Sequence, residues 1–315
     1  MSIDKKFIDQ FINVSTKAAL ASSYLVGKQD KIAADKAAVD SMRSELNKIN
    51  MNGKIVIGEG ELDEAPMLFI GEQLGTKNGP ILDIAVDPLE GTNFAANNLP
   101  GALSVIAVAE KNNLFGAPET YMEKLAVGCI EKGTVDLDFP IKKNISNLAD
   151  YKKKDISSIT ACILERPRHK KIIDDLKELK VNIKLITDGD VSGALLVTDP
   201  KHKVDIFLGT GGGPEGVLAA AALDVFDCHF QGRFIFNNEN DINRAKKMGI
   251  KDLKKKYELN EIICGDSIFC ATGITSGDLV KGIRINNNEY FSETLVTHKS
   301  SGLKTVVKKK NIIKK

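Results

Sequence analysis

The sequence has few of the residues on which several common kinds of protein depend. It contains no tryptophan, four histidines and five cysteines among 315 residues. The histidines show no H-E-x-x-H or other ligand spacing, which argues against a histidine zinc site. The cysteines form no C-x-x-C pair and their number is odd, so we expect free thiols in a reducing cytoplasm and no disulfide framework.

Long apolar runs and a strong charge of one sign are also absent. No stretch approaches the ~20 apolar residues that a membrane-spanning helix needs, and residues 1–10 are charged and polar, unlike a signal peptide. The net charge of +2 gives no overall field that favours nucleic acid or a membrane surface. The lysines within 308–315 read as a solvated terminus. We therefore expect a cytoplasmic protein without a nucleic-acid or membrane partner.

Two nucleophile and nucleotide motifs are missing as well. No G-x-S-x-G elbow occurs for serine catalysis, and no G-K-[ST] follows a glycine loop, which excludes a P-loop. What is present is ordinary globular composition, 43% hydrophobic and 27% charged, in a chain long enough for two domains. The polar, lysine-rich segment 141–155 is the expected connection, so we predict an α+β metal-binding domain at 1–150 and an α/β substrate-binding domain at 151–315.

Apolar periodicity predicts the secondary structure. Helices are expected over 3–26, 31–49, 168–180, 190–197 and 214–223, and strands over 54–57, 81–86, 102–109, 121–128, 158–164, 182–187 and 204–208. Strands and helices alternate with short links in the second half, which indicates a parallel or mostly parallel sheet.

The strand at 81–86 ends in the motif D-P-L-E-G-T, which concentrates reactive groups. Pro88 fixes its own φ and lacks an amide donor, so we expect the chain to leave the sheet there and to bring Asp87, Glu90 and Thr92 together. Open α/β sheets bind ligands at the carboxyl ends of strands, and hard divalent cations prefer carboxylate oxygens. We predict a metal site; the alternative is a solvated acidic turn.

Other acids support a metal site. The strand at 54–57 ends in G-E-G-E-L-D-E, with four acids within six residues. Like charges this close repel one another unless they splay into water or a cation holds them. Glycines on both sides of Glu59 allow close backbone approach, so we favour a cation there. Asp35, among small alanines, is either a favourable charge near a helix start or an acid in a tight, partly buried place.

Three strand ends of the second half carry groups suited to a sugar phosphate. Arg166 and Arg168 follow one strand and can each donate a fork of N–H groups to phosphate oxygens. The sequence Asp188-Gly189-Asp190 follows the next. The glycine-rich segment 209–216 follows the third and opens a helix, so its backbone N–H groups are expected to form an anion site.

The same glycine-rich segment allows two interpretations. Gly211, Gly213 and Gly216 spell the dinucleotide fingerprint G-x-G-x-x-G. However, the motif lies late in the chain, and Glu215 occupies the place of a pyrophosphate. We therefore predict Glu215 as another metal ligand, with a helix-dipole carboxylate as the alternative. Tyr121 is either a core aromatic residue or a phosphate donor.

The chain resembles the lithium-sensitive metal phosphatases, which include inositol monophosphatases and fructose-1,6-bisphosphatases, and within them the bacterial class II fructose-1,6-bisphosphatases. The resemblance runs from about residue 28 to 283. It rests on G-E-G-E-L-D-E-A-P-M-L, D-I-A-V-D-P-L-E-G-T, A-P-E-T-Y-M-E-K-L, R-P-R-H, D-G-D-V, G-G-P-E-G-V and F-C-A-T-G-I-T-S-G-D-L.

The resemblance implies an α/β (α+β) sugar-phosphatase fold, a layered α-β-α-β-α sandwich of two domains with the site between them. It implies Mn²⁺ or Mg²⁺ as cofactor. The implied metal ligands are Asp35, Glu59, Asp87, Glu90 and Glu215. The implied substrate contacts are Glu90, Gly91, Thr92, Tyr121, Arg166, Pro167, Arg168, Asp188, Gly189, Asp190 and Gly212. Asp63 and Lys31 match positions near the family's site, and we include Thr92, Asp63 and Glu59 among the catalytic residues. Relatives can carry lysine in place of Arg166 and arginine in place of Asn93.

We therefore expect metal-dependent removal of the 1-phosphate of fructose 1,6-bisphosphate in gluconeogenesis, by a water molecule that Thr92 orients. The expected partners are a small sugar bisphosphate and further copies of the chain, as a homo-oligomer (dimer or tetramer). Three alternatives remain. The same chemistry could act on sedoheptulose 1,7-bisphosphate or an inositol phosphate. A nucleotide-dependent oxidoreductase would use the glycine motif. A sensor would bind a sugar phosphate without turnover, although binding alone does not require so many acids.

Overall fold

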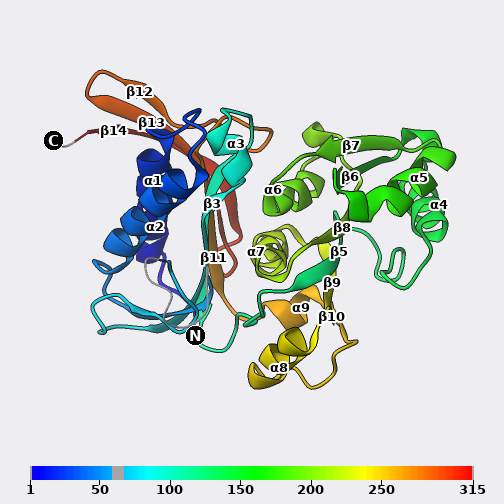
Figure 1. Ribbon diagram of the computed structural model, residues 1–315, viewed down its shortest axis with the longest axis horizontal. Helices are drawn as coiled ribbons and strands as arrows, with labels where there is room; N and C mark the ends of the chain where they lie inside the picture. Colours follow the sequence, from blue (N-terminus) through cyan, green and yellow to red (C-terminus); the bar gives the residue numbers. More distant parts are fainter. Residues whose placement is uncertain (1, 59–66, 314–315) are drawn as a thin grey trace. The chain divides into compact units, whose positions relative to one another are not determined.

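The computed structural model describes residues 2–58 and 67–313, and Figure 1 shows their course. They form a mixed α/β structure with two sheets, which confirms the expected fold class. The chain divides into two compact units: Met1–Gly116 with Ile263–Lys315, and Ala117–Ile262. The boundary expected between residues 150 and 151 falls within helix α4 (Ile141–Lys152) of the second unit. We correct it to residues 116–117 and 262–263, because strands near the C-terminus pair with strands of the first hundred residues.

The first unit has two long helices over one sheet. Its helices are α1 (Lys6–Ser23), α2 (Lys31–Leu46) and the short α3 (Thr92–Ala96). Its strands are β1 (Asn52–Ile57), β2 (Gln73–Leu74), β3 (Ile81–Glu90), β4 (Leu103–Glu110), β11 (Ser267–Gly273), β12 (Arg284–Asn286), β13 (Glu289–His298) and β14 (Leu303–Ile312). The strand order is β12-β13-β11-β4-β3-β1-β2, and β14 also pairs with β13.

The core of the first unit follows from the helical spacing of α1. Phe7, Phe11, Val14 and Ala18 recur three or four residues apart and are at most 3% exposed. α1 packs against β3, β4, β11 and β13, and α2 packs against α1 and β3. The two helices therefore hold the central strand β3, whose carboxyl end carries the predicted acids.

The second unit also combines one sheet with helices. Its strands are β5 (Tyr121–Val127), β6 (Thr160–Leu164), β7 (Asn182–Ile186), β8 (Ile206–Gly212), β9 (His229–Ile235) and β10 (Lys256–Glu258). Its helices are α4, α5 (Lys170–Glu178), α6 (Asp190–Leu195), α7 (Gly213–Leu223), α8 (Glu239–Lys247) and α9 (Leu259–Ile262). The strand order is β10-β9-β5-β8-β6-β7.

Opposite faces of this sheet carry different helices. Leu125 and Val127 of β5 belong to a core with residues of α4 and α5. Residues 122, 124 and 126 alternate to the other face, where α6 and α7 lie (Figure 1). This second face carries the polar groups described below.

The sheet of the second unit corrects one expectation. β6 pairs parallel with β7 and with β8, but β5 pairs antiparallel with β8 and β9, and β10 pairs antiparallel with β9. The sheet is therefore mixed and not mostly parallel. The helix and strand alternation used for the prediction covers β6 to β8, which is the parallel part.

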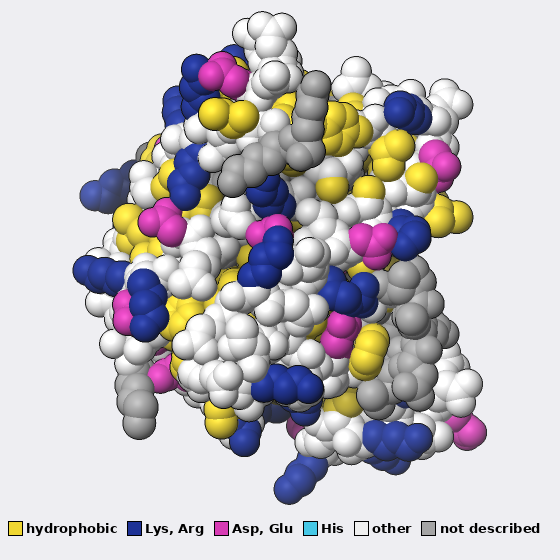
Figure 2. All heavy atoms as spheres, turned by 90° about the vertical axis from the view of Figure 1, so that its left-hand side faces the viewer, with side chains coloured by type: hydrophobic (Ala, Val, Ile, Leu, Met, Phe, Trp, Pro, Cys, Tyr) yellow, Lys and Arg dark blue, Asp and Glu magenta, His cyan; other side chains and the backbone are white. Residues whose placement is uncertain are grey.

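The helices and the surface charges of the described residues bear on possible membrane contacts. No helix within the described ranges is long and apolar enough to cross a membrane. On the face shown in Figure 2, basic side chains are scattered among acidic and hydrophobic ones. Over the chain as a whole, exposed charges form pairs, as in Lys36–Asp40 at 2.6 Å and Lys171–Asp175 at 2.9 Å. Pairs of this kind contribute little to stability.

Candidate active site

The acidic turn of the first unit is built on an irregular strand end. β3 does not stop at Pro88 as expected but runs to Glu90. Asp87 pairs with Val105 and Glu90 with Leu103, so the register shifts between them. Pro88 cannot donate a ladder hydrogen bond, and the bulge accommodates it before pairing resumes. The bulge thereby lets both acids belong to one strand.

Gly91 turns the chain from this strand into α3. Its φ of 77° lies in the left-handed region, where glycine is favoured. A Cβ at Gly91 would lie 2.8 Å from Cδ2 of Phe94, so space also requires glycine. Thr92 follows as the first residue of α3 and is half-buried. The glycine thus sets Glu90 and Thr92 on either side of one tight turn.

The acids of the first unit differ in exposure. Glu90 is 3% exposed, whereas Asp87 and Asp35 are half-buried. Asp35 lies in α2, the helix that packs against β3 and α3. A carboxylate as buried as Glu90 is costly unless other groups compensate its charge. Together these residues offer oxygen donors only, which suits Mg²⁺ or Mn²⁺ better than zinc or copper.

The complete predicted ligand set is not tested by this structure. Glu59 and Asp63 lie outside the described residues. Within 2–58 and 67–313, no three acidic, histidine or cysteine side chains gather closely enough to hold a metal ion. Asp35, Asp87 and Glu90 lie in the first unit and Glu215 in the second. The metal site therefore stays a prediction, supported by the donor chemistry of each residue.

The second unit holds a buried ion pair that the sequence did not predict. Lys124 of β5 contacts Oδ2 of Asp190, the first residue of α6, and the two side chains are 1% and 8% exposed. Gly189 precedes Asp190 with a φ of 81° and begins the helix. Asp190 was predicted to bind substrate, but its ammonium partner was missed. A lysine in a strand is normally expected to face solvent. The signal for its burial is that Lys124 shares a face of the strand with Met122 and Ala126, which are both buried.

The glycine-rich segment differs from the anion loop that we expected. Gly209 to Gly212 belong to β8 and pair with β5, so this backbone is part of a sheet. A Cβ at Gly211 would lie 2.0 Å from Oδ2 of Asp190, and one at Gly212 would lie 1.9 Å from Oε2 of Glu215. The glycines therefore make room for two carboxylates. Carboxylates in this position argue against a pyrophosphate and hence against dinucleotide binding.

Glu215 lies in the first turn of α7, next to this pair. Burial raises the pKa of its carboxyl, and the negative charges of Asp190 and Asp188 raise it further. The positive charge of Lys124 acts in the opposite direction. A bound cation would favour the ionised form of the same carboxyl.

The predicted phosphate-binding residues of the second unit lie in contact. The guanidinium of Arg168 is 4.9 Å from the centre of the Tyr121 ring, and its Nε donates to the carbonyl of Thr210 at 2.8 Å. Arg166 lies 3.7 Å from Oδ1 of Asp188. The structure thus brings Arg168 together with Tyr121, and Arg166 with Asp188. Both arginines keep further N–H donors that could bind a phosphate.

A buried histidine fixes the arginine turn. His169 ends the helical turn Pro167–His169 and is 0% exposed. Its Nε2 accepts from the backbone N–H of Thr210 at 2.7 Å, so its Nδ1 donates to the carbonyl of Leu164, also at 2.7 Å. Burial lowers the pKa of His169, which keeps the ring neutral. No role for His169 was predicted from the sequence.

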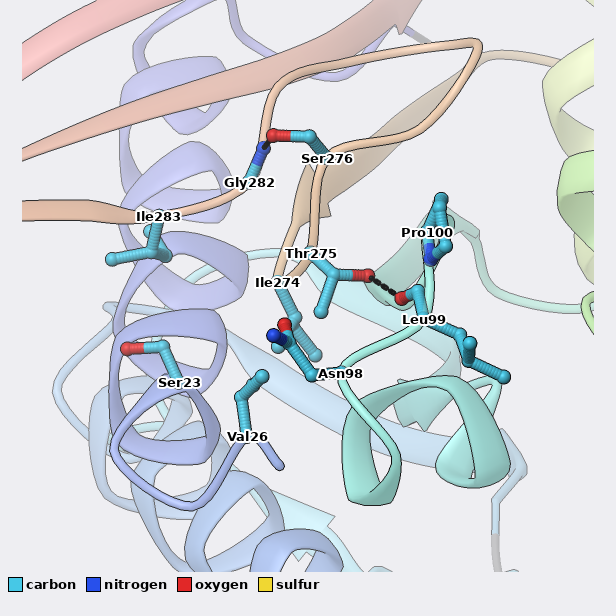
Figure 3. A pocket seen from close by; sticks show the side chains of 10 residues that line it. All are labelled: Ser23, Val26, Asn98, Leu99, Pro100, Ile274, Thr275, Ser276, Gly282 and Ile283. Atoms are coloured by element: carbon cyan, nitrogen blue, oxygen red, sulfur yellow. Dashed lines mark hydrogen bonds between the residues drawn. The ribbon is translucent and has the colours of Figure 1, made fainter. Parts of the chain in front are cut away.

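A separate cavity lies in the first unit. It has a volume of about 370 Å³ and is lined by Ser23, Val26, Asn98, Leu99, Pro100, Ile274, Thr275, Ser276, Gly282 and Ile283 (Figure 3). None of these side chains is charged. The hydroxyl of Thr275 donates to the carbonyl of Leu99 at 2.7 Å, and that of Ser276 accepts from the backbone of Gly282 at 3.0 Å. Such a lining does not suit a metal ion or a phosphate group.

The first unit carries carboxylates at a strand end, and the second carries arginines and a tyrosine; these are the side-chain types with which proteins bind divalent cations and phosphate esters. The chain belongs to the family described as bacterial fructose-1,6-bisphosphatase, glpX-encoded, which it matches over residues 5–311.

Two relatives of similar sequence carry names that agree with the family. Fructose-1,6-bisphosphatase 1 class 2 of Escherichia coli (strain K12) is 44% identical over 301 residues, which cover 91% of this chain and 89% of the relative. A Synechococcus sp. (strain JA-3-3Ab) protein, named D-fructose 1,6-bisphosphatase class 2/sedoheptulose 1,7-bisphosphatase, is 40% identical over 324 residues, or 95% and 93% of the two chains. The solved extragenic suppressor protein suhB of Bartonella henselae is 12% identical, with a TM-score of 0.43 over 81% of this chain and 93% of that chain.

Proposed function

We propose that this chain hydrolyses fructose 1,6-bisphosphate to fructose 6-phosphate and inorganic phosphate, a reaction of gluconeogenesis. The observation that carries the proposal is the family match over residues 5–311, which spans both units. In the reaction the oxygen of water forms a new bond to phosphorus, the bond from phosphorus to the C1 oxygen breaks, and that oxygen gains a proton.

The cofactor we propose is Mn²⁺ or Mg²⁺. Its ligands would be Asp35, Glu59, Asp87, Glu90 and Glu215. A divalent cation there would stabilise negative charge on the phosphoryl oxygens and lower the pKa of a water molecule. The buried position of Glu90 supports this choice, because a bound cation compensates a carboxylate that is 3% exposed.

Thr92 is the residue we assign to the attacking water. The residue is half-buried at the start of α3, two positions after Glu90. A hydroxyl accepts and donates, so it can hold a water molecule in line with the breaking bond. Glu59 and Asp63 are proposed as further catalytic residues because the sequence resembles the family at those positions.

The second unit supplies most of the proposed substrate contacts. Arg166 and Arg168 would bind the 6-phosphate, with the ring of Tyr121 holding Arg168 in place at 4.9 Å. Asp188 and Asp190 would accept hydrogen bonds from sugar hydroxyl groups. The remaining contacts, through backbone or close approach, are proposed at Gly91, Pro167, Gly189 and Gly212.

A second activity has a specific observation in its favour. The Synechococcus relative carries sedoheptulose 1,7-bisphosphatase in its name together with fructose 1,6-bisphosphatase. We therefore include sedoheptulose 1,7-bisphosphate as an alternative substrate of the same site. We also propose that the enzyme works in the cytoplasm as a homo-oligomer, dimer or tetramer, and light scattering of the purified protein measures that state.

The test is release of inorganic phosphate from three esters: fructose 1,6-bisphosphate, sedoheptulose 1,7-bisphosphate and inositol 1-phosphate. Each is assayed with Mn²⁺, with Mg²⁺ and with EDTA. We expect metal-dependent release from fructose 1,6-bisphosphate and none with EDTA. Release from another ester alone would keep the metal chemistry and overturn the substrate. Silence on all three, from folded protein with metal present, would refute the phosphatase proposal.

A further inference from the structure

Lys124 is a fully buried cation to which the proposed function assigns no role. Its side chain is 1% exposed in the middle of β5. A buried ammonium is costly unless it is paired and hydrogen-bonded. An apolar residue at this position of the sheet would avoid that cost, so the buried lysine requires a functional explanation.

Glycines surround Lys124, and the one on the helix above it leaves room for its side chain. The residues opposite Lys124 on both neighbouring strands are glycines, Gly209 of β8 and Gly232 of β9. Above it, a Cβ at Gly216 of α7 would lie 3.1 Å from Cε of Lys124. Gly216 therefore leaves space for Lys124, whereas a Cβ at Gly209 would meet the ring of His169 at 3.1 Å and one at Gly232 would meet Sδ of Met122 at 2.6 Å. The lysine reaches through this space to Oδ2 of Asp190.

The pair is not closed on itself. Oδ1 of Asp190 is buried and has no hydrogen-bond partner in the described structure. A second carboxylate, Glu215, lies close enough for the charges of Lys124 and Asp190 to affect its pKa. The charge of Lys124 thus acts on two carboxylates. In a purely structural ion pair, both carboxylate oxygens of the aspartate would accept hydrogen bonds, because an unsatisfied buried acceptor lowers stability.

We infer that Lys124 is a positioning residue: it fixes Asp190 through Oδ2 so that Oδ1 accepts a hydrogen bond from a hydroxyl group of the sugar. The inference rests on the proposed function, since it takes the ligand to be a sugar phosphate. It extends that function by naming a group, outside the predicted site, on which recognition of the sugar depends. Lys124 acts through Asp190 and does not itself touch the substrate.

The experiment measures binding and turnover separately. Calorimetry gives the Kd of fructose 6-phosphate, which needs no catalysis, and phosphate release gives KM and kcat for fructose 1,6-bisphosphate. In Lys124→Met we expect Kd and KM to rise about 10-fold or more, the effect of one hydrogen bond to a charged group. We expect kcat and the half-saturating Mn²⁺ concentration to stay within about 3-fold. Lys201→Met, in the exposed Lys201–Asp199 pair at 2.8 Å, is the matched control and should change none of them.

A double-mutant cycle separates positioning from stability. Asp190→Asn should weaken binding about as much as Lys124→Met, and the double variant should bind no more weakly than Asp190→Asn alone. Unlike Lys124→Met, the double variant leaves no buried carboxylate without its ammonium partner, so it serves if Lys124→Met fails to fold.

Three results would overturn the inference. A lowered melting temperature with unchanged Kd and KM would make Lys124 structural. A raised Mn²⁺ requirement alone would assign its action to Glu215. Binding by the double variant about 10-fold weaker than by Asp190→Asn would show an action other than through Asp190. A wild-type enzyme that binds fructose 6-phosphate but releases no phosphate would refute the proposed function and leave the binding test in force.

Discussion

At the scale of single residues, Thr92 places one hydroxyl at the first position of α3, directly after a left-handed glycine. We predict that Thr92→Ala lowers kcat about 100-fold or more, because the attacking water loses its orientation. The KM for fructose 1,6-bisphosphate should change less than about 3-fold, since the hydroxyl acts mainly in the transition state. Thr92→Ser keeps the hydroxyl and should retain most of the activity. An unchanged kcat in the alanine variant would remove Thr92 from the mechanism.

His169 gives a prediction about acid stability. Its pKa is lowered from 6.5 by burial, so the unfolded chain takes up a proton that the folded chain refuses. The stability from this residue is complete above about pH 6.5 and is lost as the pH falls toward the folded-state pKa. We predict that the free energy of unfolding declines over this window in the wild type and declines less steeply in His169→Gln.

Denaturant unfolding between about pH 7.5 and pH 5 measures both slopes. Near neutral pH the glutamine variant should be less stable by about 1–3 kcal/mol, because Thr210 or Leu164 loses a buried hydrogen-bond partner. Weaker phosphate binding should accompany the loss, since His169 holds the turn that carries Arg168. Parallel pH profiles for the two proteins would show that His169 does not titrate in this range.

At the scale of elements, two neighbouring glycines of β8 lie beside carboxylates with different proposed roles, in substrate binding and in metal binding. We predict that Gly211→Ala raises the KM for substrate, because its Cβ would lie 2.0 Å from Oδ2 of Asp190. Gly212→Ala should raise the Mn²⁺ requirement more than the KM, because its Cβ would lie 1.9 Å from Oε2 of Glu215. Each carboxylate ends a flexible side chain, so it is expected to move while the fold persists. Steady-state kinetics with substrate and metal varied in turn gives both constants, and each variant is the control for the other. Equal effects on both constants would refute separate roles.

The elements also show what periodicity can predict. The core face of α1 and the apolar runs of β3, β4 and β6 follow from spacing alone, and the structure confirms them. The end of β3 could not be read in the same way, because Pro88 normally ends a strand and here lies in a bulge. From the sequence, the glycines of β8 were expected to form a loop. Their role within a strand is visible only in the structure, where they leave room for the carboxylates of Asp190 and Glu215.

At the scale of the whole molecule, long-range pairing decides the organisation. β11 pairs with β4 from Ser267 opposite Ala109 to Gly273 opposite Leu103. No local pattern predicts such a pair, so the boundary of the units was placed wrongly although most elements of the first two thirds were located. Contacts between residues far apart in the sequence also limited what could be predicted of the candidate site. Residues within one motif, such as Asp87 and Glu90, could be grouped from the sequence, whereas Lys124 and Asp190, 66 positions apart, could not.

Metal binding gives a prediction for the molecule as a unit. A ligand that binds only the folded state stabilises it by about 2.7 kcal/mol at 100 times its Kd. We therefore predict that Mn²⁺ raises the melting temperature of the wild-type protein and that EDTA removes the rise. Asp87→Asn and Glu215→Gln should each reduce it, because both carboxylates are proposed ligands of the same site. Asp174→Asn, from the exposed Lys170–Asp174 pair, is the control and should leave the rise intact. A full rise in Glu215→Gln would return Glu215 to the role of a helix-dipole carboxylate and confine the metal ligands to the acids of the first unit and the segment that follows β1.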